Sequence, residues 1–465
     1  MLPSEHLVRA REDLRRLVRI PSVSARGECL SECAHAVRDL LVAAGFRTEI
    51  CAGEIGPFVV AEIGDGPLAV MVYNHYDVQP EDPAPLWKSP PFELSERDGR
   101  WYGRGVADDK GEFISRLEGW RLFREEHPGP LPFRFIWLID GEEEIGSPSL
   151  ETFLKTRFQD EKVDVCWWEY GEIDSTGRPI VLCGFKGVMA VELRCRTARA
   201  DLHSSLGAVF DNPLWRLAAA TASLRDGSGR VLIEGFYDAV RQPAQDGLDV
   251  AAKPPFSFDS LVQATGGQKV LDGIDEANFY AAMNFEPCMN VNGFSGGYAG
   301  EGAKTVVPAE GSVKIDFRVV PDQDPQHVVR LLRAHLDRLG FEDVELIVHD
   351  ANVKPVRSST DHWFIQDARE ILEKHFERPV IVQPSSPASG TAHPFVEQLG
   401  ADIVGIGLTH HGAMLHSPNE NIIIEQFEAM IECSAALFRR FAERAAGMRS
   451  EIKSNDVFPM NGVTP

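Results

Sequence analysis

The chain has 465 residues, of which 43% are hydrophobic and 25% are charged, and this composition excludes a wholly disordered protein. Its length favours two domains, because one domain usually takes about 100–200 residues. The 70 acidic residues outnumber the 47 basic ones, so the net charge is −23. A surface this acidic repels nucleic acid and anionic membranes, and we expect neither as a partner.

The N-terminal segment MLPSEHLVRAREDLRRL has no signal-peptide core, and no run approaches the roughly 20 apolar residues of a membrane-spanning helix. The 8 cysteines are scattered, and none forms a CxxC pair. Cys29 and Cys33 lie one helical turn apart, but two thiols alone are a weak sign of zinc. Buried free thiols in a reducing compartment are the simplest interpretation, so we expect a cytoplasmic protein.

Two amphipathic helices are predicted over the first 45 residues, where apolar stripes recur at helical spacing. Short apolar runs follow at 58–63, 68–73, 133–139, 163–168 and 401–408. Their hydrophobic residues are largely consecutive rather than alternating, which is typical of strands buried on both faces of an α/β sheet. A helical stretch at 111–126 separates two of these strands and favours parallel pairing.

The middle of the chain has a different pattern. Residues 188–195 and 311–320 alternate apolar and polar side chains, which predicts strands with one face in solvent. Helical patterns at 213–225 and 326–339 accompany them, so we expect a second, α+β domain inserted into the first. The expected bounds are 1–186 and 354–449 for the first domain, 187–353 for the insert, and 450–465 for a polar tail after a terminal helix at about 422–445.

Histidine and carboxylate side chains follow the predicted buried strands. In chain order these residues are His75, Asp77, Asp140, Glu142, Glu143, Glu144, Glu169, His410, His411 and His416. Open α/β sheets bind ligands beyond the carboxyl ends of their strands, so we expect these side chains to meet at one edge. The segment YGRGVADDKG adds Asp108 and Asp109 just before a helix.

Each of these residues also has an ordinary structural interpretation. His75 can be a structural hydrogen-bonding residue, GEEE a solvated acidic turn, and Glu169 the first residue outside the core. Asp108 and Asp109 can cap the helix, because carboxylates at a helix N-terminus meet free N–H groups and the helix dipole. A functional site is favoured because these residues converge from strand ends in both halves of a divided domain.

The donor types indicate a metal centre, since histidine and carboxylate without cysteine suit zinc, manganese or cobalt. Two histidines and three carboxylates can hold two divalent ions if one carboxylate bridges them. Asp108, Glu144 and Glu169 with a bridging hydroxide then balance the charge of the two ions. One further glutamate is left as a base, and Asp77 can accept the second ring N–H of His75 and fix its tautomer.

Five motifs in order, NHYDVQP, YGRGVADDKG, GEEEIGS, GAKTVVP and HSPNEN, resemble those of the co-catalytic zinc metallopeptidases. This family includes carnosinase-like dipeptidases, acetylornithine deacetylase, succinyl-diaminopimelate desuccinylase and aminoacylase. The resemblance extends from about residue 10 to about residue 440. It implies an α/β catalytic domain with a mostly parallel mixed sheet between helices, an inserted α+β lid domain that also dimerises, and two divalent metal ions, zinc in the first place.

The resemblance also implies the ligands. His75, Asp108 and Glu169 bind one metal ion, and Asp108, Glu144 and His416 bind the other. Asp108 is therefore the bridge between the two ions.

Glu143 is the implied general base, since the family has the base first and a ligand second in the matching pair of glutamates. The run of three glutamates leaves another register open, and the following Ile-Gly-Ser favours this one. Asp77 is implied beside the catalytic centre as the partner of His75. His411 is the alternative to His416, but only His416 is followed by SPNEN.

The inserted domain resembles the lid of the family. DLHSS places His203 where relatives stabilise the tetrahedral oxyanion. KTVVP places Thr305, and DFRVV places Arg318, where relatives hold the substrate carboxylate; the alternative for Arg318 is a surface cation beside an aspartate. SGTAH places Gly390 and Thr391 where the catalytic domain contacts substrate.

The implied reaction is hydrolysis of an amide by a metal-bound hydroxide, with Glu143 as general base, His203 at the oxyanion and Arg318 at a terminal carboxylate. WKSPPFE, GGYAGEGAKT and VPDQDP resemble the dipeptidase branch, so dipeptides or small peptides are the expected substrates. A deacylase of N-acyl amino acids is the alternative. A non-catalytic binding protein on this fold would have lost a ligand or the base, and none is lost. We also expect a homodimer formed through the lid.

Overall fold

The computed structural model describes residues 2–241, 243, 245–251 and 254–455, which fold into two compact units. The first unit comprises Met1–Cys183, Ser358–Pro384 and Pro394–Pro465, and the second comprises Gly184–Arg357 and Ser385–His393. Residues 385–393, expected with the first domain, fold with the second unit. There the backbone N–H of Lys186 donates to the carbonyl groups of Ser386 and Ala388.

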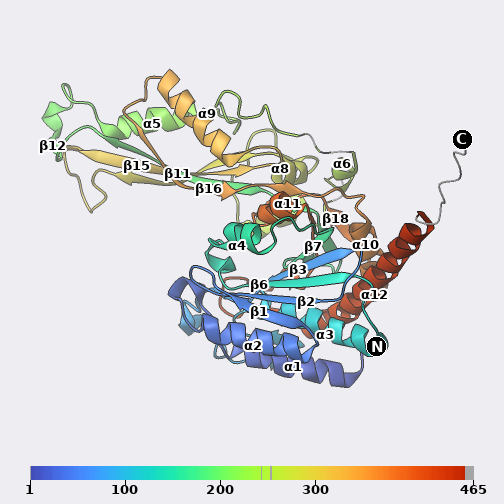
Figure 1. The fold of residues 1–465 in the computed structure, drawn as a ribbon. Coiled ribbons are helices and arrows are strands. Elements are labelled where there is room, and N and C mark those ends of the chain that lie inside the picture. Colours follow the sequence, from blue (N-terminus) through green and yellow to red (C-terminus); the bar gives the residue numbers. More distant parts are fainter. Residues whose placement is uncertain (1, 242, 244, 252–253, 456–465) are drawn as a thin grey trace, which may run out of the picture. The chain divides into compact units, whose positions relative to one another are not determined.

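A 10-stranded mixed sheet is the framework of the first unit, in the order β1-β2-β6-β3-β7-β19-β9-β8-β20 with β18 beside β9 (Figure 1). The strands are β1 Arg47–Cys51, β2 Phe58–Ile63, β3 Ala69–His75, β6 Arg134–Asp140, β7 Val165–Trp168, β8 Glu172–Ile173, β9 Pro179–Leu182, β18 Ile381–Gln383, β19 Asp402–Gly405 and β20 Thr409–His410. The central strands β6, β3, β7 and β19 run parallel, whereas β1 and β2 extend one edge in antiparallel fashion. Each apolar run that predicted a buried strand forms one of these strands, so the predicted α/β sheet is confirmed.

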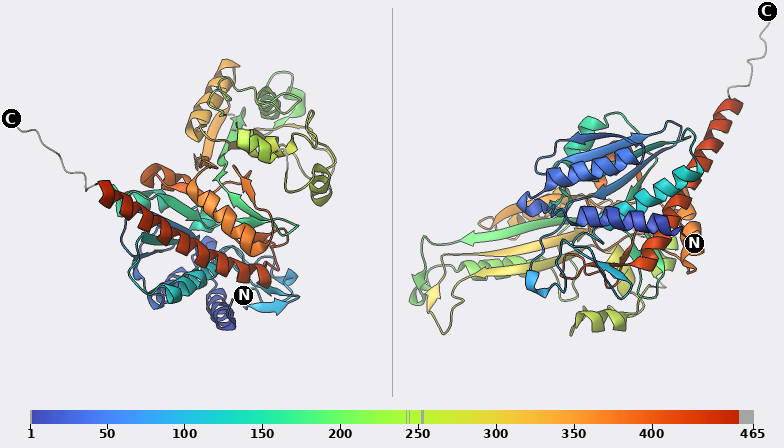
Figure 2. Two further views of the ribbon diagram at one scale, coloured as in Figure 1. Left: turned by 90° about the vertical axis from the view of Figure 1, so that its right-hand side faces the viewer. Right: turned by 90° about the horizontal axis from the view of Figure 1, so that it is seen from below.

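Helices cover both faces of this sheet (Figure 1). They are α1 Ser4–Val18, α2 Leu30–Ala43, α3 Lys110–Glu126, α4 Leu150–Arg157, α10 Trp363–Phe376, α11 His393–Leu399 and α12 Ile424–Asn455. On one face α12 lies between α3 and α10 (Figure 2), and their apolar side chains form a core around Trp120. On the other face Phe153 of α4 stacks on Phe58, and Phe395 of α11 packs edge-on against Tyr73.

A small antiparallel sheet in the first unit joins two motifs that are far apart in the sequence. Its strands are β4 Ser95–Arg97, β5 Arg100–Tyr102 and β21 Asn421–Ile423, in the order β21-β5-β4. Asn421 pairs with Tyr102, so HSPNEN ends beside the start of YGRGVADDKG. Helix α12 follows at once and continues beyond the predicted end near residue 445 to Asn455; residues 456–465 of the expected tail lie outside the described residues.

The second unit is built on a 4-stranded antiparallel sheet in the order β13-β15-β11-β16 (Figure 1). The strands are β11 Gly187–Arg196, β13 Cys288–Gly296, β15 Glu310–Val319 and β16 Glu345–Val353. Helices α5 Pro213–Ser223 and α9 Pro325–Arg338 pack on one face. On β15 the side chains of Val313, Ile315, Phe317 and Val319 are buried and their neighbours are more exposed, which confirms the predicted alternation.

Shorter elements complete the two units. In the second unit they are β10 Gly184–Phe185, β12 Leu202–His203, η4 Ser204–Leu206, α6 Gln245–Ala251, α7 Phe258–Thr265, α8 Phe279–Phe285, β14 Val306–Val307 and β17 Val356–Arg357. In the first they are η1 Ser24–Arg26, η2 Ala84–Leu86 and η3 Glu143–Ile145, all 3-10 helices. Within the described residues, no helix is both long enough and apolar enough to span a membrane.

Candidate metal centre

The carboxyl ends of three parallel strands bring the expected side chains to one edge of the first unit's sheet. β3 ends at His75 and β6 ends at Asp140, and these two residues are paired in register. Glu169 directly follows β7, which pairs with the other side of β3. The 3-10 helix η3, which begins at Glu143, follows β6 and therefore lies at the same edge.

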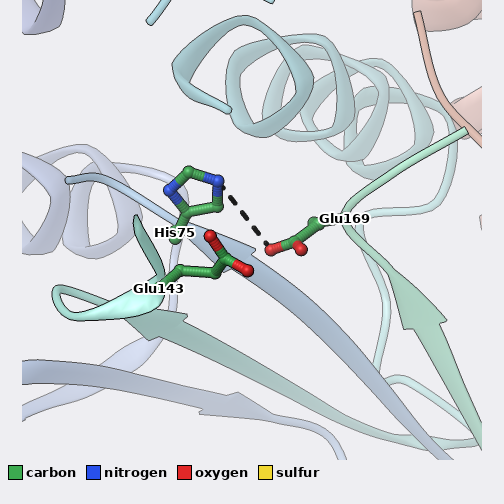
Figure 3. A group of neighbouring side chains, drawn as sticks. All are labelled: His75, Glu143 and Glu169. Atoms are coloured by element: carbon green, nitrogen blue, oxygen red, sulfur yellow. Dashed lines mark ion pairs between the residues drawn. The ribbon is translucent and has the colours of Figure 1, made fainter. Parts of the chain in front are cut away.

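Two groups of side chains at this edge have the donor atoms of a metal site. Among the described residues, the first group is His75, Glu143 and Glu169 and the second is Asp108, Glu144 and His416, each with donor atoms within 4.8 Å of one another. Figure 3 shows the imidazole of His75 and the carboxylates of Glu143 and Glu169 turned toward a common space. His411, the alternative to His416, is exposed and belongs to neither group.

Asp108 connects the two groups. Its Oδ1 lies 3.0 Å from Nε2 of His75, and its Oδ2 lies 3.0 Å from Nε2 of His416. Nε2 of His416 is also 3.2 Å from Oε2 of Glu144, and Nε2 of His75 is 3.9 Å from Oε2 of Glu169. A carboxylate that offers one oxygen to each group has the geometry needed to bridge two cations.

The three consecutive glutamates have different environments. Glu142 is buried, and its carboxylate accepts the backbone N–H of Gly56 at 3.0 Å, so it fastens a neighbouring loop. The carboxylate of Asp77 accepts the backbone N–H groups of Glu143 at 3.2 Å and Glu144 at 3.0 Å. The turn is thereby fixed with the side chains of Glu143 and Glu144 at the two donor groups. That Glu143 is the base and Glu144 a ligand stays a prediction from the Ile-Gly-Ser register.

Asp77 also lies beside His75. Nδ1 of His75 is 3.0 Å from the backbone carbonyl oxygen of Asp77 and 3.4 Å from Oδ1 of its carboxylate. Both acceptors favour a proton on Nδ1, which leaves Nε2 as the donor atom toward a metal ion. The nearer acceptor is the backbone carbonyl, so the Asp77 carboxylate acts mainly on the η3 turn.

Two further buried carboxylates, Glu420 and Asp109, lie beside the loop of Asp108, and neither was expected among the metal ligands. Glu420 accepts the backbone N–H of Asp108 at 3.1 Å and pairs with Arg104 at 2.8 Å. Oδ2 of Asp109 accepts the backbone N–H of His75 at 2.9 Å. Glu420 lies inside the HSPNEN motif, so the sequence could have indicated a role for it. The pattern around Asp109 fits a helix cap equally well.

The centre is strongly negative. Burial raises the pKa of Glu143 to about 8. Burial, with the nearby charge of Glu143, raises the pKa of Glu169 well above its ordinary value. Hydrogen bonds to Asp108 and Glu144 raise the pKa of His416 to about 10. A histidine that holds its proton this strongly marks a place where positive charge is stabilised.

The donor set fits divalent metal ions. It contains imidazole and carboxylate groups and no thiolate, which suits zinc, manganese or cobalt. Oε2 of Glu169 is buried and accepts no hydrogen bond from any described residue. A buried carboxylate oxygen without a partner is costly, and a cation between Glu169 and His75 would satisfy it.

Two of the expected lid residues, His203 and Thr305, are adjacent in the second unit. Strand β12 pairs with β14, and the backbone N–H of Ser204 donates to the carbonyl of Thr305 at 3.2 Å. His203 is exposed, and its Nδ1 lies 2.9 Å from Oγ of Ser205. The imidazole is thus oriented by its own chain and accessible to a ligand through its other nitrogen.

Arg318, expected at the substrate carboxylate, lies beside the segment of Gly390 and Thr391 in the second unit. Nη1 of Arg318, on β15, donates to Oγ of Ser389 at 2.9 Å. Ser389 directly precedes Gly390 and Thr391, so the three expected substrate contacts lie on two adjoining segments. Arg318 is also near Asp316, at 3.7 Å, which is the ordinary surface pairing considered from the sequence.

Comparison with known proteins identifies the class, and the chain is a metallopeptidase. It belongs to peptidase family M20/M25/M40, whose model matches residues 71–440. The resemblance seen in the five motifs is therefore confirmed.

Its relatives include dipeptidases and a carboxypeptidase. The Cys-Gly metallodipeptidase DUG1 of Candida albicans is 28% identical, covering 90% of this chain and 91% of that protein. Human Beta-Ala-His dipeptidase is 29% identical, covering 84% of this chain and 78% of that protein. Among solved structures, an M20 family metallo-carboxypeptidase from Sulfolobus solfataricus has a TM-score of 0.86 and 33% identity, covering 93% of this chain and 99% of that one. Human carnosine dipeptidase 1 has a TM-score of 0.74 and 25% identity, covering 95% and 97%.

Proposed function

We propose that this protein hydrolyses the amide bond of dipeptides or small peptides with the help of two divalent metal ions. The observation that carries the proposal is the position of Asp108, whose carboxylate oxygens face His75 and His416 next to Glu143. The similar proteins named for Cys-Gly and Beta-Ala-His dipeptides support the substrate class.

The proposed ligands are His75, Asp108 and Glu169 for one ion and Asp108, Glu144 and His416 for the other. When bound, the ions lower the pKa of a coordinated water and polarise the scissile carbonyl. Oε2 of Glu169 accepts no hydrogen bond from any described residue and lies 3.9 Å from Nε2 of His75, which supports its place among the ligands. Zinc is our first choice for the metal, with manganese or cobalt as alternatives that the same donors accept.

Glu143 is the proposed general base. Its carboxyl group lies in the His75 group, and burial raises its pKa to about 8. A carboxylate at this position can take a proton from the attacking water and return it to the leaving amine. Asp77 is a positioning residue in this account, because it holds both the backbone of Glu143 and Nδ1 of His75.

The substrate contacts are assigned to the second unit. We place His203 at the tetrahedral oxyanion and Arg318 at the terminal carboxylate of the substrate. The bond from Arg318 to Ser389 uses one of its five N–H donors and leaves others for a bidentate pair. The remaining proposed contacts are Thr305, Gly390 and Thr391.

We also propose a homodimer formed through the second unit. Large apolar side chains are exposed in the segment after His203, where Val209 and Trp215 are each 76% exposed and Phe210 is 48% exposed. Strand β13 is an edge of its sheet, and Phe294 on it is 51% exposed. Exposed apolar groups and a sheet edge are typical of surfaces that bind another chain, and a second copy is the partner we propose.

The reducing cytoplasm is the proposed compartment. None of the 8 cysteines, all of which the structure describes, forms a disulfide, which supports this location because disulfides form in oxidising compartments. The net charge of −23 supports a protein without nucleic acid or membrane partners.

A substrate panel tests the proposed function. The zinc-loaded protein is offered Cys-Gly, β-Ala-His and other unmodified dipeptides beside N-acetyl amino acids, and the release of free amino acids is measured. We expect the dipeptides to be hydrolysed in preference. Hydrolysis of the N-acetyl amino acids alone would assign the deacylase activity instead. Failure on both substrate classes with zinc, manganese and cobalt would contradict an amide hydrolase.

A further inference from the structure

Arg116 is a buried cation beneath the candidate metal centre. It lies in the second turn of α3, and its side chain is fully buried. Nη1 donates to the carbonyl of Tyr73 at 3.2 Å, and Nη2 donates to the carbonyls of Trp168 at 2.8 Å, Glu169 at 2.9 Å and Ile406 at 2.9 Å. These acceptors belong to the ends of β3, β7 and β19, which are neighbours in the sheet.

The carbonyl contacts offset part of the cost of burying this charge. A buried guanidinium is expensive unless its N–H groups are hydrogen-bonded. Nη1 and Nη2 of Arg116 have acceptors, whereas its Nε has no hydrogen-bond partner among the described residues. The charge is partly compensated by four strand-end carbonyls and by the ring of Trp167, whose centroid is 4.7 Å from the guanidinium carbon. A lysine, with a single ammonium, cannot reach carbonyls of three strands in these directions.

Two of the three strand ends that Arg116 contacts, those of β3 and β7, lead to ligands of the first ion. Tyr73 is two residues before His75, and Nη1 also donates to Oδ1 of Asn74 at 3.3 Å. Glu169 is bonded through its own carbonyl, and α3 itself follows directly after Asp108. One side chain thus joins the three segments that carry the ligands of the first ion.

A different arginine serves the other side of the centre. Arg104 pairs with Glu420, which accepts the backbone N–H of Asp108 and lies in the segment that follows His416. Arg104 therefore supports the loop of the bridging carboxylate and the neighbourhood of His416, whereas Arg116 contacts neither His416 nor Glu144. Arg116 therefore contacts the strand ends near His75 and Glu169, and Arg104 contacts the segments near Asp108 and His416.

We propose that Arg116 is a positioning residue for the metal ion held by His75, Asp108 and Glu169, because it fixes the ends of β3, β7 and β19 against one another. The inference rests on the proposed function, which supplies the ligand assignment. Arg116 lies outside the motifs that contain the ligands, eight positions beyond Asp108 on a buried face of α3.

Zinc affinity is the readout that tests this role. Metal-free protein is titrated with zinc against a chromophoric chelator, and wild type is expected to bind two equivalents. In Arg116→Lys we expect one equivalent to bind roughly 10–100-fold more weakly, the usual cost of losing a residue that orients ligands, and the other to be unchanged. The matched control is Arg124→Lys on the same helix, where the guanidinium donates to the carbonyls of Gly129 and Pro128; it should bind both equivalents as wild type does.

Double variants show which ion position is affected. Combined with Glu169→Ala, Arg116→Lys should add little, because both changes act on the same ion. Combined with His416→Ala, the two losses should add. The reverse pattern would overturn the proposal, and so would equal weakening of both equivalents in step with a lower melting temperature, which a merely structural role predicts.

Arg116→Met extends the test and is expected to weaken the same equivalent further than Arg116→Lys. If the methionine variant does not fold, the lysine variant decides the question alone, and unchanged binding of both equivalents in it would refute the inference. Wild-type protein that binds no zinc would instead contradict the proposed function, so the two failures are distinguishable.

Discussion

Glu420 accepts a hydrogen bond from the backbone N–H of Asp108 at 3.1 Å, although 312 positions separate the two residues. The Glu420 carboxylate is buried and pairs with Arg104 at 2.8 Å. This contact fastens the segment that carries His416 to the loop that carries Asp108. The separation of Asp108 and His416 is therefore set partly by this contact between the Glu420 carboxylate and the Asp108 backbone. The Asp108 and His416 side chains set the rest by contacting each other.

The run of three glutamates should give three distinct phenotypes. Glu143→Gln should retain metal and lose activity roughly 10²–10⁴-fold, because it removes the general base. Glu144→Gln should lose metal, since its carboxylate belongs to the His416 group. Glu142→Gln is the matched control and should lower the melting temperature instead, because it fastens a loop through Gly56. Metal analysis beside turnover measures all three, and exchanged results for Glu143 and Glu144 would place the register one residue away.

The metal-free protein should lose stability as pH rises from about 6.5 to about 8. Burial raises the pKa of Glu143 to about 8 from an ordinary 4.5, and that of Asp140 to about 7 from 3.8. In this pH range the folded protein holds protons on these carboxyl groups that the unfolded chain has already released. The free energy of unfolding therefore falls as the folded groups ionise. Histidines whose pKa is lowered act in the opposite direction, but only below this range; they are His335, His362, His375 and His410.

Melting temperatures of chelator-treated protein across this range measure the effect. Zinc should restore most stability at the alkaline end, because metal ions replace the protons on the ligands. Glu143→Gln should flatten the dependence, since its side chain cannot ionise. A melting temperature of the metal-free protein that rises with pH over the range would contradict this account of the centre.

Arg318 should discriminate between substrates by their C-terminus. Arg318→Ala is expected to reduce kcat/KM for dipeptides with a free carboxylate by roughly 10–100-fold, the loss of a charge-assisted hydrogen-bonded pair. Dipeptide amides should be affected much less. The control is Arg241→Ala, which removes a surface arginine of the same unit that pairs with Asp322. Equal losses on acids and amides would show that Arg318 does not bind the carboxylate.

Complementation should reveal whether His203 acts across a dimer. We propose that each active site takes Glu143 from its own chain and His203 from the partner. Glu143→Ala and His203→Ala should each be nearly inactive alone. Co-refolded in equal amounts, half the dimers would be mixed, each with one intact site of two, so activity should return to roughly a quarter of wild type. Verified heterodimer without recovered activity would place His203 in its own chain or outside the reaction.

Most of the framework could be predicted from the sequence because hydrophobic burial has a short-range signature. The consecutive apolar runs at 68–73 and 133–139 became β3 and β6, and the alternation at 311–320 became β15. Edge strand β13 was not predicted, because an edge strand with exposed side chains lacks the pattern that burial imposes. The segment 230–285 gave no prediction either, and its helices α6, α7 and α8 are short.

The site was predicted only in part, for a related reason. His75, Asp108, Glu143 and His416 stand in motifs, and the first unit brings them together. Arg116 could not be predicted in this way. Its acceptors are mainly backbone carbonyls at the ends of three strands, and every residue type has a backbone carbonyl. Contacts between a side chain and distant backbone depend on tertiary structure and must be read from it.

Metal removal and replacement, measured on dipeptide hydrolysis, tests the central claim most directly. Protein treated with chelator and shown by elemental analysis to be metal-free should have no activity. Stepwise addition of zinc, manganese or cobalt should restore turnover, with full activity reached at two equivalents per chain. Full activity in protein proved free of metal would contradict the two-metal account.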